Sequence, residues 1–105
     1  MQGCSVDRVG KLRIIHVFDE FTARTAGRLV ETIRAVSDET DGRIILSILE
    51  SRDIDPDCVN TAIDELGDIH WRLTLAAAPG IRDYSPLRDH GSGVRYASCF
   101  GEVFQ

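Results

Sequence analysis

The sequence is almost without lysine: Lys11 is the only one, and the other eleven of its twelve basic residues are arginine. Acidic residues outnumber basic ones, so the formal net charge is −5 and the pI is near 5.0. This balance argues against a surface that binds nucleic acid or an anionic membrane. No apolar run approaches the roughly 20 residues of a membrane span, and the first ten residues do not form a signal peptide. We therefore expect a soluble, cytoplasmic protein.

Cysteine is also scarce. Cys4, Cys58 and Cys99 are odd in number, lie far apart and form no CxxC pair. Neither a disulfide framework nor a zinc site is indicated. The sequence shows no internal repeat, linker or low-complexity segment, and its 105 residues are enough to bury one core. We expect a single domain over residues 1–105.

One stretch, Gly42–Leu66, organises the rest of the chain. Arg43–Leu49 is apolar almost without alternation, which is typical of a strand buried on both faces, and we expect both alternating sets of apolar side chains there to be buried. Asp55-Pro56 then combines a favoured N-cap with a favoured first helical residue. Gly67 is placed as the C-terminal stop of this helix. The apolar positions at helical spacing are Val59, Ala62, Ile63 and Leu66. Such a strand, loop and helix form a parallel α/β unit, in which function gathers at the carboxyl end of the strand.

Further elements follow from the same patterns. The strands expected beside the central one are Ser5–Val9, Leu12–Phe18, Trp71–Ala78 (with Trp71, Leu73 and Leu75 on one side) and Val94–Ala97. Thr22 can cap a helix whose apolar face is Ala26, Leu29, Val30, Ile33 and Val36. A short helix at Ser85-Pro86 and a terminal apolar turn or tail at Phe100, Val103 and Phe104 complete the order. This order predicts an α/β domain with a mixed β-sheet and its helices packed mainly on one face.

Three segments, Ile14–Ile33, Gly42–Leu66 and Gly91–Phe104, share their hydrophobic spacing with one known family. In this order they resemble the opening strand and first helix, the phosphorylation loop with its flanking strand and helix, and the closing strand and helix of the STAS domain. This is the fold of bacterial anti-sigma-factor antagonists and of sulfate-transporter tails. The resemblance spans nearly the whole chain. It implies a STAS-like α/β domain that acts in bacterial regulation.

The loop in the second of these segments reads Ile54-Asp55-Pro56-Asp57-Cys58. In phospho-regulated STAS domains it reads roughly Ile-Asp-Ser-Ser-Gly, and a partner kinase phosphorylates the first serine. Aligned on the aspartate, Pro56 occupies the phosphoacceptor position and has no hydroxyl. The resemblance therefore implies a binding site for an anti-sigma factor or related kinase without the usual serine switch. Its residues are Asp53, Asp55, Pro56, Asp57 and Cys58.

Other kinds of site have weaker support in the residues. The carboxylates of Glu50, Asp53, Asp55 and Asp57 suit Mg²⁺ or Ca²⁺ but lack the spacing of an EF-hand, so we expect no metal. Asp55 and Asp57 are explained by the start of the helix alone. A receiver domain, which Asp19-Glu20 could suggest, would need a lysine late in the chain, and there is none.

The sequence shows no combination of residues that could act together in catalysis. His16, His70 and His90 lie on separate predicted elements, no Ser/His/Asp combination is visible, and Gly91-Ser92-Gly93 is too short to cradle a phosphate. A helix N-terminus can activate a thiol such as Cys58, but the neighbouring aspartates oppose this, so we expect Cys58 to pack as a small hydrophobe. We predict a protein-interaction module without cofactor or enzymatic activity. The alternative is a domain that senses a small molecule or nucleotide near the loop. An apolar pocket beside Trp71 would support this alternative.

Overall fold

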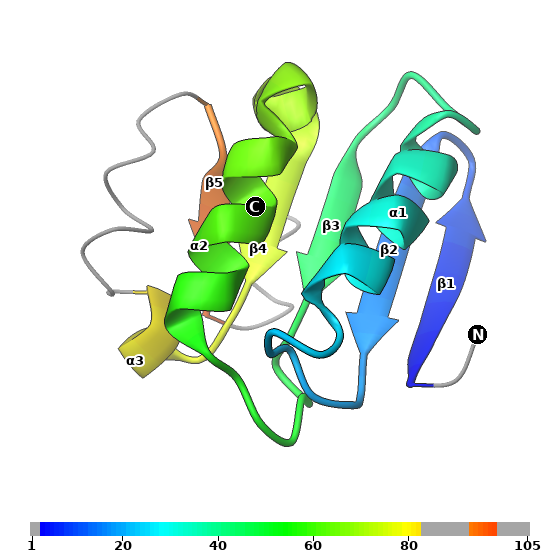
Figure 1. Cartoon of the computed structure of the whole chain (residues 1–105). Coiled ribbons are helices and arrows are strands. Elements are labelled where there is room, and N and C mark those ends of the chain that lie inside the picture. The colour runs from blue at the N-terminus through cyan, green and yellow to red at the C-terminus, as the bar shows by residue number, and fades with distance from the viewer. Residues whose placement is uncertain (1–2, 83–92, 99–105) are drawn as a thin grey trace.

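A five-stranded sheet in the order β1-β2-β3-β4-β5 forms the body of the computed structural model, which describes residues 3–82 and 93–98 (Figure 1). β1 (Cys4–Val9) pairs antiparallel with β2 (Leu12–Val17). β3 (Ile44–Ser47), β4 (Leu73–Ala76) and β5 (Arg95–Ala97) continue from β2 in parallel. The sheet is therefore mixed, as the sequence predicts, and β1 lies at one of its edges.

The turn between β1 and β2 depends on Gly10. Val9 pairs with Leu12, so only Gly10 and Lys11 connect the strands. Gly10 has φ +59°, whereas no non-glycine residue described has a positive φ. A two-residue hairpin turn with a positive φ at its first position is the type II′ turn, which matches the twist of the flanking strands. Gly10 thereby fixes the register of the whole β1–β2 pair.

Two helices cover the same face of the sheet, α1 (Ala26–Ser37) and α2 (Pro56–Glu65), and Figure 1 shows both in front of the strands. Their apolar stripes meet alternate residues of the strands. The fully buried large side chains of this core include Phe21, Ile15, Ile33, Ile44, Leu46, Ile48, Ile63, Leu66, Leu73 and Leu75. A third helical turn, α3 (Pro79–Arg82), follows β4. The predicted α/β class with helices mainly on one face is confirmed.

The central strand is buried on both sides. Ile44, Leu46 and Ile48 belong to the core under the helices, while Ile45, whose side chain points to the other face, is only 2% exposed. Leu49 was expected to be buried too, and this is wrong: its side chain is half-buried. The ladder ends at Ser47, and the turn in which the Ser51 N–H bonds the Ile48 carbonyl (3.2 Å) bends the chain away.

The strand predicted over Trp71–Ala78 begins two residues later than expected. Trp71 lies in the 3-10 helix η1 (Gly67–Arg72) and is 68% exposed, so it does not share a buried side with Leu73. Gly67 does not stop α2 in a left-handed conformation either. The chain instead tightens directly into η1, where Ile69 and His70 are buried and a His70 ring nitrogen bonds the Ile63 carbonyl (2.6 Å).

The start of α1 also differs from the prediction. The N-cap is Thr25 rather than Thr22, and the helix begins at Ala26. Thr22 closes the preceding turn, since its carbonyl accepts the N–H groups of Thr25 (3.0 Å) and Ala26 (2.9 Å). The other predicted strands and the Asp55-Pro56 helix start are confirmed to within a few residues. The expected helix at Ser85-Pro86 and the tail at Phe100, Val103 and Phe104 lie outside the described residues.

Candidate functional site

The loop between β3 and α2 is hydrogen-bonded to the segment that follows β2. The Phe21 N–H donates to the Asp53 carbonyl (2.7 Å), and the Asp55 N–H donates to the Phe21 carbonyl (2.9 Å). These two bonds form an isolated parallel bridge between Phe21 and Ile54, and the Phe21 side chain below it is fully buried. The two loops at the carboxyl ends of β2 and β3 are therefore joined through backbone as one unit.

Side chains add a second set of ties between the same loops. The Ser51 hydroxyl donates to the Val17 carbonyl (2.9 Å), and the Arg52 guanidinium pairs with the Asp19 carboxylate (2.8 Å). The bond from Arg52, and after it the Glu20 N–H, lowers the pKa of Asp19. The Arg52 and Asp19 side chains are 79% and 46% exposed, so solvent screens their attraction. The backbone bridge, rather than this ion pair, therefore sets the geometry of the loop.

The predicted site residues begin α2. Asp55 is the N-cap, and its carboxylate accepts the Asp57 N–H (3.0 Å), with Pro56 as the first helical residue. Asp53, Asp55 and Asp57 are exposed, whereas Pro56 and Cys58 are half-buried. The structure thus brings all five residues together in one short stretch at the carboxyl edge of the sheet.

Cys58 behaves as the sequence suggests. Its side chain packs against the core, and burial, followed by the nearby carboxylates of Asp55 and Asp57, raises the pKa of its thiol. The neutral thiol is favoured, which suits packing rather than nucleophilic chemistry. Within residues 3–82 and 93–98, no three His, Cys, Asp or Glu side chains are arranged to hold a metal ion.

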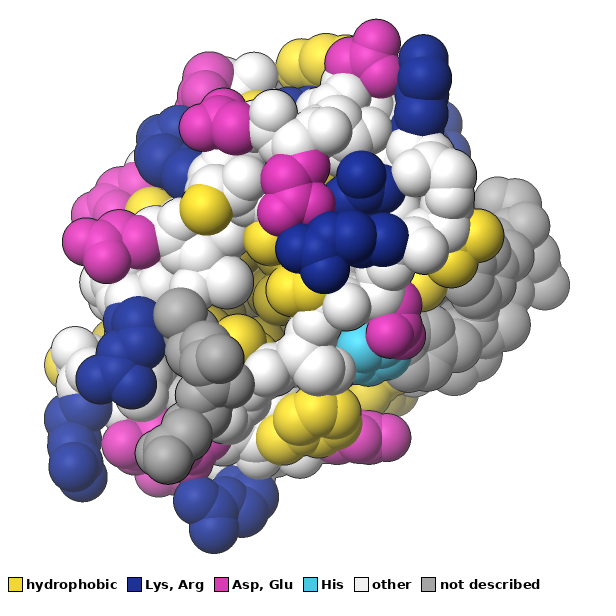
Figure 2. Space-filling view, turned by 90° about the vertical axis from the view of Figure 1, so that its right-hand side faces the viewer, with side chains coloured by type: hydrophobic (Ala, Val, Ile, Leu, Met, Phe, Trp, Pro, Cys, Tyr) yellow, Lys and Arg dark blue, Asp and Glu magenta, His cyan; other side chains and the backbone are white. Residues whose placement is uncertain are grey.

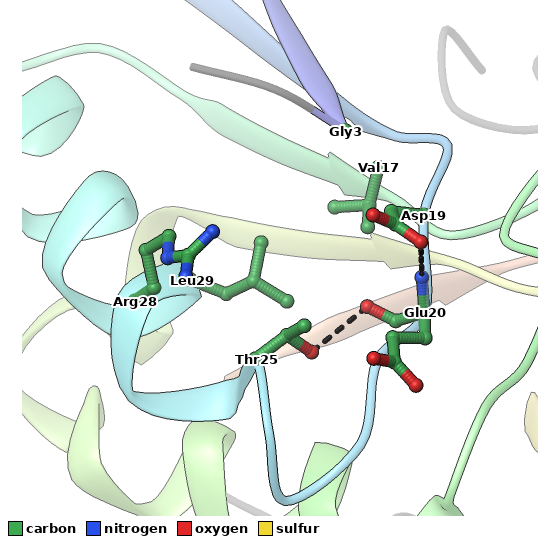
Figure 3. A pocket seen from close by; sticks show the side chains of 7 residues that line it. All are labelled: Gly3, Val17, Asp19, Glu20, Thr25, Arg28 and Leu29. Atoms are coloured by element: carbon green, nitrogen blue, oxygen red, sulfur yellow. Dashed lines mark hydrogen bonds between the residues drawn. The ribbon is translucent and has the colours of Figure 1, made fainter.

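A cavity lies between the end of β2 and the start of α1, and Figure 3 shows its lining. Thr25 closes one side by donating to the Glu20 carbonyl (2.8 Å), while Arg28 and Leu29 approach from α1. Its volume of about 20 Å³ is room for roughly one water molecule. An open groove beside it is lined by Gly3, Phe18, Asp19 and Arg52.

The sequence did not reveal the neighbours of the loop. Phe21, Ser51 and Arg52 contact the loop or the segment beside it, yet these contacts were not predicted. Ser51 was considered only as the end of a strand and a possible phosphorylation site, and Asp19 only as the end of a strand and for a receiver domain. One signal could have found them: parallel strands end at the same sheet edge, so residues just after β2 and β3 must meet. None of the helices within the described residues has the length and apolar content to cross a membrane.

Comparison with known proteins supports a fold rather than a close relationship. No protein-family model and no curated protein matches the sequence. Among solved structures, the anti-sigma factor antagonist SpoIIAA in its unphosphorylated form matches with a TM-score of 0.57 and 15% identity, over 96% of this chain and 93% of that one. An uncharacterised protein of the DUF3478 family from Shewanella loihica, with a SpoIIAA-like fold, matches with a TM-score of 0.55 and 6% identity, over 96% and 89%. At these identities the likeness shows the fold alone, and the chain has the SpoIIAA-like, STAS-like fold that its sequence predicts.

Proposed function

We propose that this chain is a protein-interaction module of the anti-sigma-factor antagonist type, acting in bacterial regulation by binding rather than by catalysis. It meets a partner protein, an anti-sigma factor or related kinase, through the Asp53–Cys58 loop and the exposed face of α2. The observation that carries this proposal is the fold likeness to SpoIIAA over 96% of the chain. That protein is itself an anti-sigma factor antagonist.

The way the loop is held supports a binding role. The Phe21 bridge fixes the loop backbone, while the carboxylates of Asp53 and Asp57 remain on the surface. A loop that is already ordered loses little conformational entropy when a partner binds, so more of the contact energy appears as affinity.

Binding at this site is not switched by phosphorylation of Pro56, which has no hydroxyl. Residues 50–61 contain two hydroxyls, and both are hydrogen-bonded within the chain. Ser51 donates to the Val17 carbonyl (2.9 Å), and Thr61 donates to the Asp57 carbonyl (3.0 Å). After incubation with a candidate anti-sigma kinase and ATP, we expect mass spectrometry to find residues 50–61 unmodified. Phosphate on Ser51 or Thr61 would show that a switch exists at another position.

The binding test uses purified kinase-type anti-sigma factors from the organism that encodes the chain, titrated calorimetrically. Asp53→Lys reverses an exposed charge on the loop, while the Asp53 carbonyl that anchors the loop remains. We expect it to weaken binding at least about tenfold. The matched control, Asp41→Lys, reverses an exposed charge at the opposite edge of the sheet and should leave affinity unchanged. Equal effects of both variants, or no binding to any candidate, would contradict the proposal.

A further inference from the structure

Several basic side chains near the amino ends of β2 and β3 are held by carboxylates of this chain. Arg8 and Arg13 both bond the Glu39 carboxylate (2.7 and 3.2 Å). Lys11 pairs with Asp41 (3.3 Å). Figure 2, which views the molecule from the β1 side, shows basic and acidic side chains in contact on this surface. Two further arginines, on the other face of the sheet, are placed differently.

These two arginines, Arg43 and Arg95, lie on either side of Thr74. The Arg13 N–H donates to the Arg43 carbonyl (3.0 Å), so the pairing of β2 with β3 extends to Arg43. Ile44 belongs to the core under the helices, and successive side chains of a strand alternate, so Arg43 points to the face opposite α1 and α2. There its guanidinium donates to the Thr74 hydroxyl (2.7 Å). Arg95 is directly opposite Thr74 in the β4–β5 pair and shares this face.

Neither guanidinium is bonded to a carboxylate among residues 3–82 and 93–98. Arg43 is half-buried, and burial, followed by the positive charge of Arg95, lowers the pKa of its guanidinium. A partly desolvated charge beside a like charge costs free energy unless an opposite charge offsets it. The neutral Thr74 hydroxyl does not supply that charge. An anion bound between the two arginines would supply it.

We propose that Arg43 and Arg95, on either side of Thr74, bind a dianionic phosphate group of a small molecule. Two guanidiniums match its two negative charges, and each presents N–H groups in the planar fork that suits phosphate oxygens. The bond to Thr74 uses one of the five N–H donors of Arg43 and orients the others. The net charge of −5 disfavours larger polyanions such as nucleic acid.

This site is separate from the proposed partner surface. Thr74 and Arg95 lie at the amino ends of β4 and β5, whereas the Asp53–Cys58 loop follows the carboxyl end of β3. The two proposals can therefore fail independently. Because Arg95 is exposed and water competes for it, we expect a dissociation constant for inorganic phosphate on the order of 1 mM.

The test follows amide NMR signals while sodium phosphate replaces sodium chloride at constant ionic strength. The pH is about 8, where phosphate carries close to two negative charges. We expect the signals of Thr74 and Arg95 to move and to saturate, while those of the Asp53–Cys58 loop stay fixed. Sodium acetate, which has a single charge, should bind at least about tenfold more weakly. The absence of a saturable shift, shifts confined to other parts of the chain, or equal binding of acetate would overturn the proposal.

Substitutions of single arginines test which side chains hold the phosphate. Arg95→Gln removes an exposed guanidinium and leaves the backbone pairing of β4 with β5, and we expect it to weaken phosphate binding at least about tenfold. Arg43→Gln should do the same, and thermal melts check that each variant is folded. Arg24→Gln, at an arginine that is 85% exposed in the turn before α1, is the matched control and should leave affinity unchanged. Unchanged affinity of Arg95→Gln, or equal weakening by Arg24→Gln, would show that the proposal is wrong.

Discussion

The loops at the two ends of the parallel strands are held by different contacts: those at the carboxyl ends of β2 and β3 (the carboxyl edge) and the one before the amino end of β3 (the amino edge). At the carboxyl edge, backbone groups of Phe21, Asp53 and Asp55 hold the loops together, and the aspartate side chains are left exposed. At the amino edge, the Arg72 side chain holds the loop instead. The Arg72 guanidinium donates to the carbonyls of Thr40 (2.6 Å), Gly42 (3.0 Å) and Ser37 (2.9 Å), so it ties the end of α1 to the start of β3.

This difference determines at which edge side chains can be substituted without loss of the loop geometry. A loop held by its backbone can change its side chains without losing its shape, whereas an edge held by one arginine cannot. Gly42 makes the amino edge still less tolerant, because a Cβ there would overlap the backbone of Lys11. On the proposed function, the exposed aspartates of the carboxyl edge are the side chains that meet a partner.

The largest effect should come from removing the support under the carboxyl edge. Phe21→Ala deletes a fully buried ring directly below the backbone bridge, and we expect it to cost about 3–5 kcal/mol of unfolding free energy. Urea titration measures this. Phe18→Ala is the matched control: Phe18 is 42% exposed, so its loss should cost under about 1 kcal/mol. Similar losses of unfolding free energy for the two variants would show that the Phe21 ring does not support the loop.

At the amino edge, Arg72→Ala should destabilise less. Three carbonyls lose a charged donor, and a hydrogen bond to a charged group contributes about 1.5–3 kcal/mol net. Because the three bonds share one guanidinium and are only part-buried, so that water can take its place, we expect a total loss of about 2 kcal/mol. Arg72→Lys should restore only part of it, because an ammonium cannot reproduce the planar fork. Arg24→Ala, which removes an arginine that is 85% exposed, should change stability by under about 0.5 kcal/mol. Full rescue by lysine would contradict the geometric argument.

Acid should weaken the ion pairs of Glu39 with Arg8 and Arg13 at the amino edge. The bonds from Arg8, helped by Arg13, lower the pKa of Glu39 from 4.5 to about 2. Because the folded pKa is depressed, this stabilisation is present above about pH 4.5 and is lost as the pH falls toward 2. Thermal melts of Glu39→Gln should therefore depend less on pH in this window than those of the wild type. An unchanged slope would mean that solvent screens the cluster completely.

How far the sequence predicts the structure depends on the range of the interaction. The buried β3 and the Asp55-Pro56 helix start follow from neighbouring residues, and both were predicted. Trp71 was misplaced because a large apolar residue before a strand resembles the strand itself, and only the docking of η1 against α2 decides otherwise. The bridge of Phe21 to Asp53 and the contacts of Arg72 join residues some thirty positions apart. They depend on strand register, which no local pattern contains.

The smallest expected effect concerns Asp57, and it separates the two roles of a carboxylate at the carboxyl edge. Asp57 is in the first turn of α2, where a negative charge interacts favourably with the helix dipole, so Asp57→Asn should lower stability by a few tenths to about 1 kcal/mol. On this structural role, partner affinity should change less than tenfold while the melting temperature falls slightly. The opposite pattern, an affinity change of tenfold or more with a fixed melting temperature, would mean that Asp57 supplies a permanent negative charge beside the Pro56 position. Calorimetric binding and melting of the same variant, set beside Asp53→Lys, distinguish the two. Because a carboxylate has less charge and fewer acceptor oxygens than a phosphate, we expect the structural outcome.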